Sequence, residues 1–201
     1  KAQRDNLPGI HANTQVPKAQ GCAKAYEITG DKTMKTAADF FWNTVVKHHT
    51  YVTGGNSSRE HFGPEDKLND RFDNPTETCN TYNMLKLTTH LFSWNTRQEY
   101  IAYYERALYN PILGSQNPDD GMCLYYTPLC PGGKKNYLAP DAFVCCSGTG
   151  MENHIKYADF IYAQGEANSL FVNLFIPSRL DWKERGLVVT QDSDIPFGNI
   201  A

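Results

Sequence analysis

The feature that most constrains the fold is a change in apolar spacing near residue 166. Before it, apolar residues recur three and four positions apart, as on one face of an α-helix; after it, two runs rich in β-branched and aromatic residues are typical of strands. Gly30 is expected to end the first helix and Asp31 to cap the second. The predicted helices cover residues 16–28, 31–49, 76–94, 97–112 and 151–163, and the predicted strands cover 122–127, 169–176 and 187–190.

This pattern predicts a mainly α chain, with a helical domain over residues 1–166 and the first strands of a β domain over residues 167–201. Apolar periodicity is equally compatible with a helical bundle and with an α/α toroid. The helices are interrupted by a long loop over residues 51–75, and a loop of this length inside a compact domain is usually functional or disordered.

The charge and hydropathy of the chain exclude two classes of partner. The formal net charge is −3 at pH 7, whereas nucleic-acid binding needs a basic surface. No apolar run approaches the roughly 18 residues of a membrane span. The polar start at Lys1 does not resemble a signal peptide, so any signal segment is not in this chain, and we expect the chain to be a piece of a longer protein.

Cysteines are the most informative residue type in the chain, which has six of them: Cys22, Cys79, Cys123, Cys130, Cys145 and Cys146. An even number fits disulfides in a secreted protein. Cys145 and Cys146 are adjacent, however, and a disulfide between neighbours closes a strained ring. Metal binding or cysteine chemistry is therefore a stronger interpretation than disulfides, although the spacing alone, which lacks paired CxxC motifs, favours a set of buried free cysteines.

Two short stretches supply one candidate metal site. Glu77 and Cys79 open the third predicted helix; because residues two apart on a regular helix point to nearly opposite sides, they are expected to converge only at an irregular first turn. Cys145 and Cys146 precede the Gly-rich residues 147–150, which we expect to form a turn that brings both sulfurs together. Three thiolates and a carboxylate form the tetrahedral set that Zn²⁺ prefers.

Longer motifs around these residues carry a family resemblance. They are Tyr51-Val52-Thr53-Gly54-Gly55, Glu77-Thr78-Cys79-Asn80-Thr81-Tyr82-Asn83-Met84-Leu85-Lys86-Leu87, Glu105-Arg106-Ala107-Leu108-Tyr109-Asn110, Cys145-Cys146-Ser147-Gly148-Thr149-Gly150-Met151-Glu152-Asn153-His154 and Leu170-Phe171-Val172-Asn173. In composition and order they resemble the zinc-dependent cysteine glycosidases, the bacterial β-L-arabinofuranosidases of glycoside hydrolase families 127 and 146. The similarity runs from near His11 to the end of the chain.

The resemblance implies an (α/α)₆ barrel followed by β-sandwich domains, with this chain holding the later barrel helices and the first strands. It implies a retaining glycosidase that acts on an oligosaccharide or glycan and is periplasmic or secreted; the oligomeric state stays unknown. The implied Zn²⁺ ligands are Glu77, Cys79, Cys145 and Cys146. Cys145 also matches the nucleophile. Glu60 matches the acid/base, although Glu65 lies close by in a loop of slightly different length, and His11 and Tyr126 match substrate-contacting positions.

Two other readings of the same residues remain. The four ligands would equally serve a structural zinc site in a non-catalytic carbohydrate-binding or scaffold protein, in which Glu60 and His11 would have no reason to face the metal. Alternatively, Cys145 would be the nucleophile of a metal-free cysteine hydrolase or transferase, activated by His154 or His61.

Overall fold

A computed structural model of the chain describes residues 3–68 and 74–194. The backbone divides into two compact units, Lys1–Lys156 and Tyr157–Ala201, and the boundary falls inside a short helix. The described residues are mainly helical, as predicted. The assignment of the two regions to a barrel and a β-sandwich stays a prediction.

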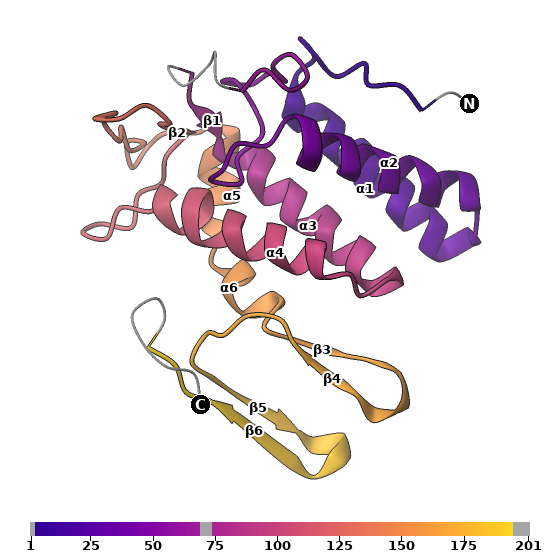
Figure 1. Cartoon of the computed structure of the whole chain (residues 1–201). Helices are drawn as coiled ribbons and strands as arrows, with labels where there is room; N and C mark the ends of the chain where they lie inside the picture. The colour runs from indigo at the N-terminus through magenta and orange to yellow at the C-terminus, as the bar shows by residue number, and fades with distance from the viewer. Residues whose placement is uncertain (1–2, 69–73, 195–201) are drawn as a thin grey trace. The chain divides into compact units, whose positions relative to one another are not determined.

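The first unit is built around one buried helix, α3 (Thr78–Trp94). It packs against α1 (Ala12–Thr29), α2 (Lys32–His48), α4 (Gln98–Ala107) and α5 (Cys145–Glu152), and Figure 1 shows α1 and α2 side by side as a hairpin. A helix that is buried around most of its circumference belongs in a core rather than at a surface. The site described below has two parts: one lies at the start of α3, and the other lies on α5, which packs against α3.

The core around α3 includes a buried tryptophan with a satisfied polar group. Trp42 is fully buried, and its indole Nε1 donates a hydrogen bond of 2.9 Å to Oγ1 of Thr88. The rings of Tyr100 and Tyr103 meet the Trp42 ring edge to face, at centroid distances of 4.6 and 5.8 Å. A buried N–H needs such a partner because leaving it unpaired costs about 1–3 kcal/mol.

The ends of the first two helices follow local sequence signals. Gly30 ends α1 in the left-handed conformation, at φ 73°, and the side chain of Asp31 accepts a hydrogen bond of 2.8 Å from the N–H of Thr33. Both were predicted. The helix α1 begins at Ala12, four residues before the predicted start, and encloses Pro17.

The third and fourth predicted helices are present with altered ends. Thr76–Glu77 forms β1 before α3 begins, and α4 continues into a π-helical turn over Leu108–Ile112 and a 3₁₀ turn over Leu113–Ser115. The predicted strand 122–127 is paired regularly only as β2 (Tyr126–Thr127), which runs antiparallel to β1. In the predicted loop 51–75 the described residues contain no helix or regular strand, and residues 69–73 lie outside the described part.

The predicted fifth helix over 151–163 is confirmed only in part, since its bounds are wrong and its last residues are not helical. The helix α5 already begins at Cys145, a second short helix α6 covers Ile155–Asp159, and Tyr162–Gln164 is a strand, β3. The Gly-rich residues 147–150 are therefore helical, not a turn. A Cβ on Gly150 would overlap the sulfur of Cys123, so the glycine lets α5 approach that side chain closely.

The second unit consists of two antiparallel hairpins. The strand β3 pairs with β4 (Leu170–Val172), and β5 (Ser178–Trp182) pairs with β6 (Leu187–Gln191). The β4 and β6 segments were predicted, whereas β3 and β5 were not. Leu174, which lies between β4 and β5 in the sequence, is fully buried. The side-chain amide of Gln191 donates hydrogen bonds of 3.0 and 2.6 Å to the carbonyls of Leu174 and Ile176.

No helix among the described residues combines the length and the apolar character needed to cross a membrane.

Candidate active site

The site starts at the junction of β1 and α3. Glu77 is the N-cap of α3 and has extended backbone angles, φ −75° and ψ 131°, whereas Thr78 is already helical. This switch of backbone conformation lets the side chains of Glu77 and Cys79 lie on the same side, as the sequence predicted for an irregular first turn. The junction is anchored by Ser57, whose Oγ accepts a hydrogen bond of 2.9 Å from the Glu77 N–H.

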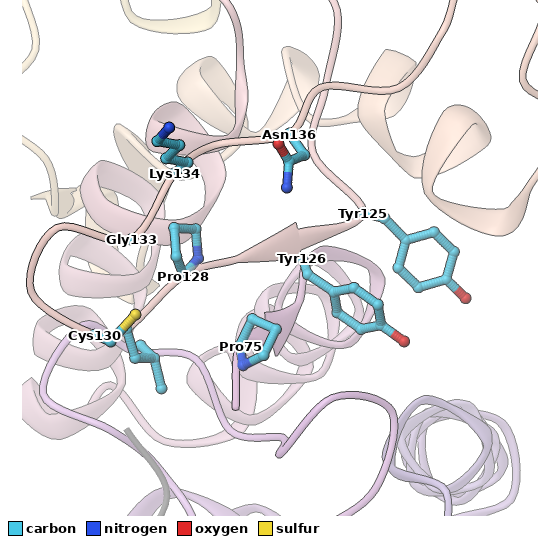
Figure 2. A pocket seen from close by; sticks show the side chains of 9 residues that line it. Pro75, Tyr125, Tyr126, Pro128, Cys130, Gly133, Lys134 and Asn136 are labelled. Carbon is cyan, nitrogen blue, oxygen red and sulfur yellow. The ribbon is translucent and has the colours of Figure 1, made fainter. Parts of the chain in front are cut away.

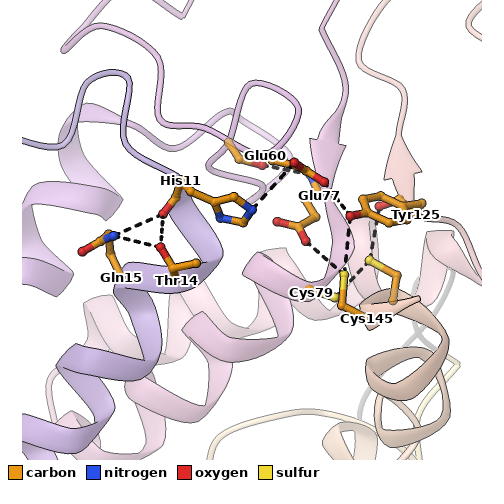
Figure 3. Close-up of polar contacts among 10 residues, drawn as sticks. His11, Thr14, Gln15, Glu60, Glu77, Cys79, Tyr125 and Cys145 are labelled. Carbon is orange, nitrogen blue, oxygen red and sulfur yellow. Dashed lines mark hydrogen bonds and ion pairs between the residues drawn. The ribbon is translucent and has the colours of Figure 1, made fainter. Parts of the chain in front are cut away.

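The second part of the site is the first turn of α5. Cys145 and Cys146 are its first two residues; Cys146 is fully buried, whereas Cys145 is exposed. The sulfur of Cys146 lies 3.0 Å from that of Cys79, and the sulfur of Cys145 lies 3.6 Å from Oε1 of Glu77. The four candidate ligand atoms of Glu77 and the three cysteines all lie within 4.8 Å of one another. The predicted metal-ligand set is thus gathered in one place (Figure 3).

The chemistry of this cluster fits a divalent cation. The Oε2 atom of Glu77 is buried and has no hydrogen-bond partner. Burial, with the acidic Cys79 beside it, raises the pKa of Glu77 to about 8. The hydrogen bond between the two thiols lowers the pKa of Cys79 and raises that of Cys146. A carboxylate and thiolates packed this closely need a positive charge, and Zn²⁺ is the ion that three thiolates and one carboxylate suit best.

Glu60 lies beside this cluster, on the loop that precedes β1. Its Oε1 accepts a hydrogen bond of 2.5 Å from the hydroxyl of Tyr125, and its Oε2 lies 3.7 Å from Nε2 of His11. The hydrogen bond from Tyr125 lowers the pKa of Glu60. The backbone fixes this arrangement, because the Glu60 carbonyl accepts a 2.7 Å hydrogen bond from the N–H of Ala12, next to His11.

The alternative acid, Glu65, lies elsewhere. One of its carboxylate oxygens is 3.6 Å from Nδ1 of His48, at the end of α2. Of the two glutamates, Glu60 is therefore the one that the structure joins to the cysteine cluster, through Tyr125.

Tyr125 is a site residue that the sequence reasoning missed. Its hydroxyl lies 3.5 Å from the sulfur of Cys145 as well as 2.5 Å from Glu60, so it stands between the two groups (Figure 3). Tyr126, which was predicted to contact substrate, is adjacent; its hydroxyl is a smaller cause of the lowered pKa of Glu60. Neighbouring residues of a strand normally point to opposite faces, and the sequence offered no signal to choose between the two tyrosines.

A buried amide network supports the loop that carries Ser57 and Glu60. The Asn56 amide donates a hydrogen bond of 3.0 Å to the Tyr103 hydroxyl and accepts one from Asn80, one residue after Cys79. Gly54 has φ 103° and lies so close to Ala107 that a Cβ would be 2.7 Å from the Ala107 Cα. The loop is therefore held against α3 and α4 by contacts that only glycine and small polar groups allow.

The structure gives no support to activation of Cys145 by a histidine. The Cys145 thiol lies 3.6 Å from Glu77 and 3.5 Å from the Tyr125 hydroxyl and also hydrogen-bonds with Cys79. Of the two histidines considered, His61 packs its ring against that of His11, at a centroid distance of 5.3 Å.

Taken together, the fold and the site define a mainly helical protein with a candidate Cys₃Glu metal centre beside a carboxylic acid. The model of the GH127 β-L-arabinofuranosidase catalytic domain matches residues 1–159. The chain belongs to this family, as the resemblance predicted. No curated protein matches the chain.

Solved structures share this fold. A GH127 β-L-arabinofuranosidase from Geobacillus stearothermophilus T6 matches 92% of the chain at 24% identity and a TM-score of 0.72. A GH127 β-arabinofuranosidase and a protein described as a glycoside hydrolase match the same share, at 24% and 19% identity and TM-scores of 0.78 and 0.76. The chain spans about a third of these structures, at 32%, 30% and 35% of their lengths.

The anchoring of Glu77 by Ser57 can be tested by stability. Ser57→Ala removes the acceptor and leaves the buried N–H of Glu77 unpaired, so we expect the free energy of unfolding in urea to fall by about 1–3 kcal/mol. The matched control is Ser93→Ala, which removes an exposed hydroxyl bonded to the carbonyl of His90 and should change stability by less than about 0.5 kcal/mol. Equal effects of the two variants would contradict the anchoring role.

Proposed function

We propose that this chain carries the catalytic site of a retaining glycoside hydrolase that releases β-L-arabinofuranose, or a related furanose, from plant-type glycans. The observation that carries the proposal is the position of the exposed Cys145 thiol. It lies 3.6 Å from the buried Glu77 and 3.5 Å from the Tyr125 hydroxyl that holds Glu60. A nucleophile and an acid thus share one small site, joined by a single hydroxyl group.

In this proposal Glu77, Cys79, Cys145 and Cys146 hold a zinc ion. When bound, the ion supplies positive charge that keeps the thiols deprotonated at neutral pH, where a free cysteine with a pKa of about 8.5 is mostly protonated. The buried, unpartnered Oε2 of Glu77 supports this ligand role.

The residues of the chain then divide the reaction between them. The Cys145 sulfur attacks the anomeric carbon and forms a C–S bond, while the bond from that carbon to the departing oxygen breaks and Glu60 gives this oxygen a proton. In the second step Glu60 takes a proton from water, the water oxygen bonds to the anomeric carbon, and the C–S bond breaks. Two displacements at one carbon retain its configuration.

Tyr125 and His11 position Glu60, and the hydrogen bond from Tyr125, which lowers the pKa of Glu60, favours the carboxylate that takes a proton from water in the second step. Burial raises the pKa of the Tyr125 hydroxyl, which therefore stays a hydrogen-bond donor to Glu60. His11 lies 3.7 Å from the other oxygen of Glu60 and is about a third exposed, so one of its faces is open to a substrate. Tyr126 is the second substrate contact in this proposal.

A purely structural zinc site is the competing function. Such sites are closed by four protein ligands and need no acid beside them. Tyr125 joins Glu60 to Cys145, and His11 lies against Glu60 (Figure 3); this arrangement favours catalysis.

We also propose the wider setting that the family suggests. Residues 1–166 would contribute the later helices of an (α/α)₆ barrel, and residues 167–201 the first strands of a β-sandwich, within a longer protein. Its place of action would be the periplasm or the cell exterior, where polymeric glycans are encountered. The match to about a third of each solved relative supports this arrangement.

Metal analysis tests the ligand set. The purified protein is expected to contain about one zinc ion per chain, as a single four-ligand site requires. Cys79→Ala should lose most of this zinc because it removes one thiolate. Cys22→Ala is the matched control, since Cys22 lies on α1 outside the cluster. The same zinc content in both variants would exclude Cys79 as a ligand.

The nucleophile is tested by Cys145→Ser. We expect hydrolysis of an aryl β-L-arabinofuranoside to fall by about four orders of magnitude or more, as for other catalytic nucleophiles, while part of the zinc is retained by the other three ligands. Cys22→Ser should leave the rate unchanged. Near-normal activity of the Cys145 variant would remove the covalent mechanism.

The acid is tested by the dependence of the rate on the leaving group. Glu60→Gln should slow an alkyl glycoside, whose departing oxygen needs a proton, by about 10²–10⁴-fold. An activated aryl glycoside needs little protonation and should be slowed much less in its first step. Glu65→Gln is the matched control and should affect neither substrate. Equal losses on both substrates in the Glu60 variant would assign the proton to another residue.

A further inference from the structure

A pocket of about 390 Å³ shares Tyr125 and Tyr126 with the proposed catalytic site, whereas the other residues that line it have no role in the mechanism above. Its volume lies within the roughly 300–1,000 Å³ of pockets that bind small molecules. The residues that carry the argument are Pro75, Tyr125, Tyr126, Pro128, Lys134 and Asn136, all of which line it (Figure 2). We call it the side pocket.

The side pocket adjoins the proposed acid through its two tyrosines. Both line the pocket, and Figure 2 shows their hydroxyl groups pointing away from Pro128 and Cys130. The Tyr125 hydroxyl is the one that donates the 2.5 Å hydrogen bond to Glu60. One wall of the pocket is therefore also the support of the group that would protonate the departing oxygen.

The opposite wall is held in place by contacts with the rest of the first unit. It is the segment 130–136, which is tied to the body of the unit by a 2.6 Å hydrogen bond from Nζ of Lys135 to the carbonyl of Gly114. The segment also lies close to β2, because a Cβ on Gly133 would be 2.8 Å from the Cβ of Pro128. These contacts leave Lys134 and Asn136 free to supply polar groups to the pocket.

The chemistry of the lining suits a sugar. Tyrosine and proline rings offer flat apolar surfaces for the C–H faces of a sugar ring, while an ammonium group and an amide bind its hydroxyl groups. Among the residues that line the pocket, Lys134 carries the only formal charge, so no carboxylate competes with the ligand for it.

We propose that the side pocket binds the leaving-group sugar, the glycan unit attached to the departing oxygen. This inference rests on the proposed function, because the leaving group must lie on the side of Glu60 that protonates it. The enzyme would then prefer substrates in which the released arabinofuranose is linked to a further sugar, with Lys134 and Asn136 setting that preference.

Kinetics on two substrates test the proposal. One is methyl β-L-arabinofuranoside, whose leaving group is too small to fill the side pocket; the other is a β-linked disaccharide of L-arabinofuranose. The double variant Lys134→Ala/Asn136→Ala loses up to two hydrogen bonds, so kcat/KM for the disaccharide should fall about tenfold, chiefly through KM, with the methyl glycoside unchanged. Lys32→Ala removes an exposed lysine at the start of α2 and should change neither. Equal losses on both substrates in the double variant would overturn the proposal.

A second measurement is independent of turnover. Cys130 lines the side pocket and is exposed, so its alkylation by iodoacetamide, followed by mass spectrometry, reports whether the pocket is filled. Arabinotriose should slow the labelling of Cys130 severalfold in the wild-type protein but not in the double variant, and should leave Cys22, on α1, unaffected. Unchanged labelling of Cys130 at saturating sugar would overturn the side pocket as a sugar site. If wild-type protein hydrolyses neither substrate, the proposed function fails, and this labelling alone decides the inference.

Discussion

The structure of the site depends on one electrostatic constraint, the close packing of a carboxyl group and three thiols of which only the Cys145 thiol is exposed. Burial raises the pKa of Glu77, and its acidic neighbours Cys79 and Glu60 raise it further. Without a cation these groups cannot all be ionised together, because burial removes the water that would screen their charges. The ligand set therefore makes sense as one part of a metal complex, and the hydrogen bonds of Ser57 and Tyr125 hold it in place.

Local signals predicted much of the fold. Gly30 and Asp31 mark helix ends because their effect comes from their own backbone and side chain. The convergence of Glu77 and Cys79 was also predictable, since it follows from the change of backbone angles at a helix N-cap. The Gly-rich residues after Cys146 were misread as a turn because two glycines in four residues favour a turn locally, whereas in the structure these residues lie in α5, where Gly150 packs against Cys123.

The tyrosine beside Glu60 shows the same limit of local reasoning. The family resemblance assigned a substrate contact to Tyr126 and no role to Tyr125. What places the Tyr125 hydroxyl between Glu60 and Cys145 is the pairing of β1 with β2, in which Glu77 faces Tyr126 and the carbonyl of Tyr125 accepts the N–H of Thr78. This register joins segments almost 50 residues apart and leaves no trace in the spacing of either segment. Family resemblance supplied the ligand set, whereas the geometry supplied the tyrosine.

The close contact of Gly150 with Cys123 has a consequence for the geometry of the donor atoms. The cysteine pair begins a helix that packs against α3, and the other two donors come from the N-terminus of α3 itself. A side chain at residue 150 would meet the Cys123 sulfur, so α5 could not keep its place. The spacing of the donors therefore depends on a residue that is not itself a candidate ligand.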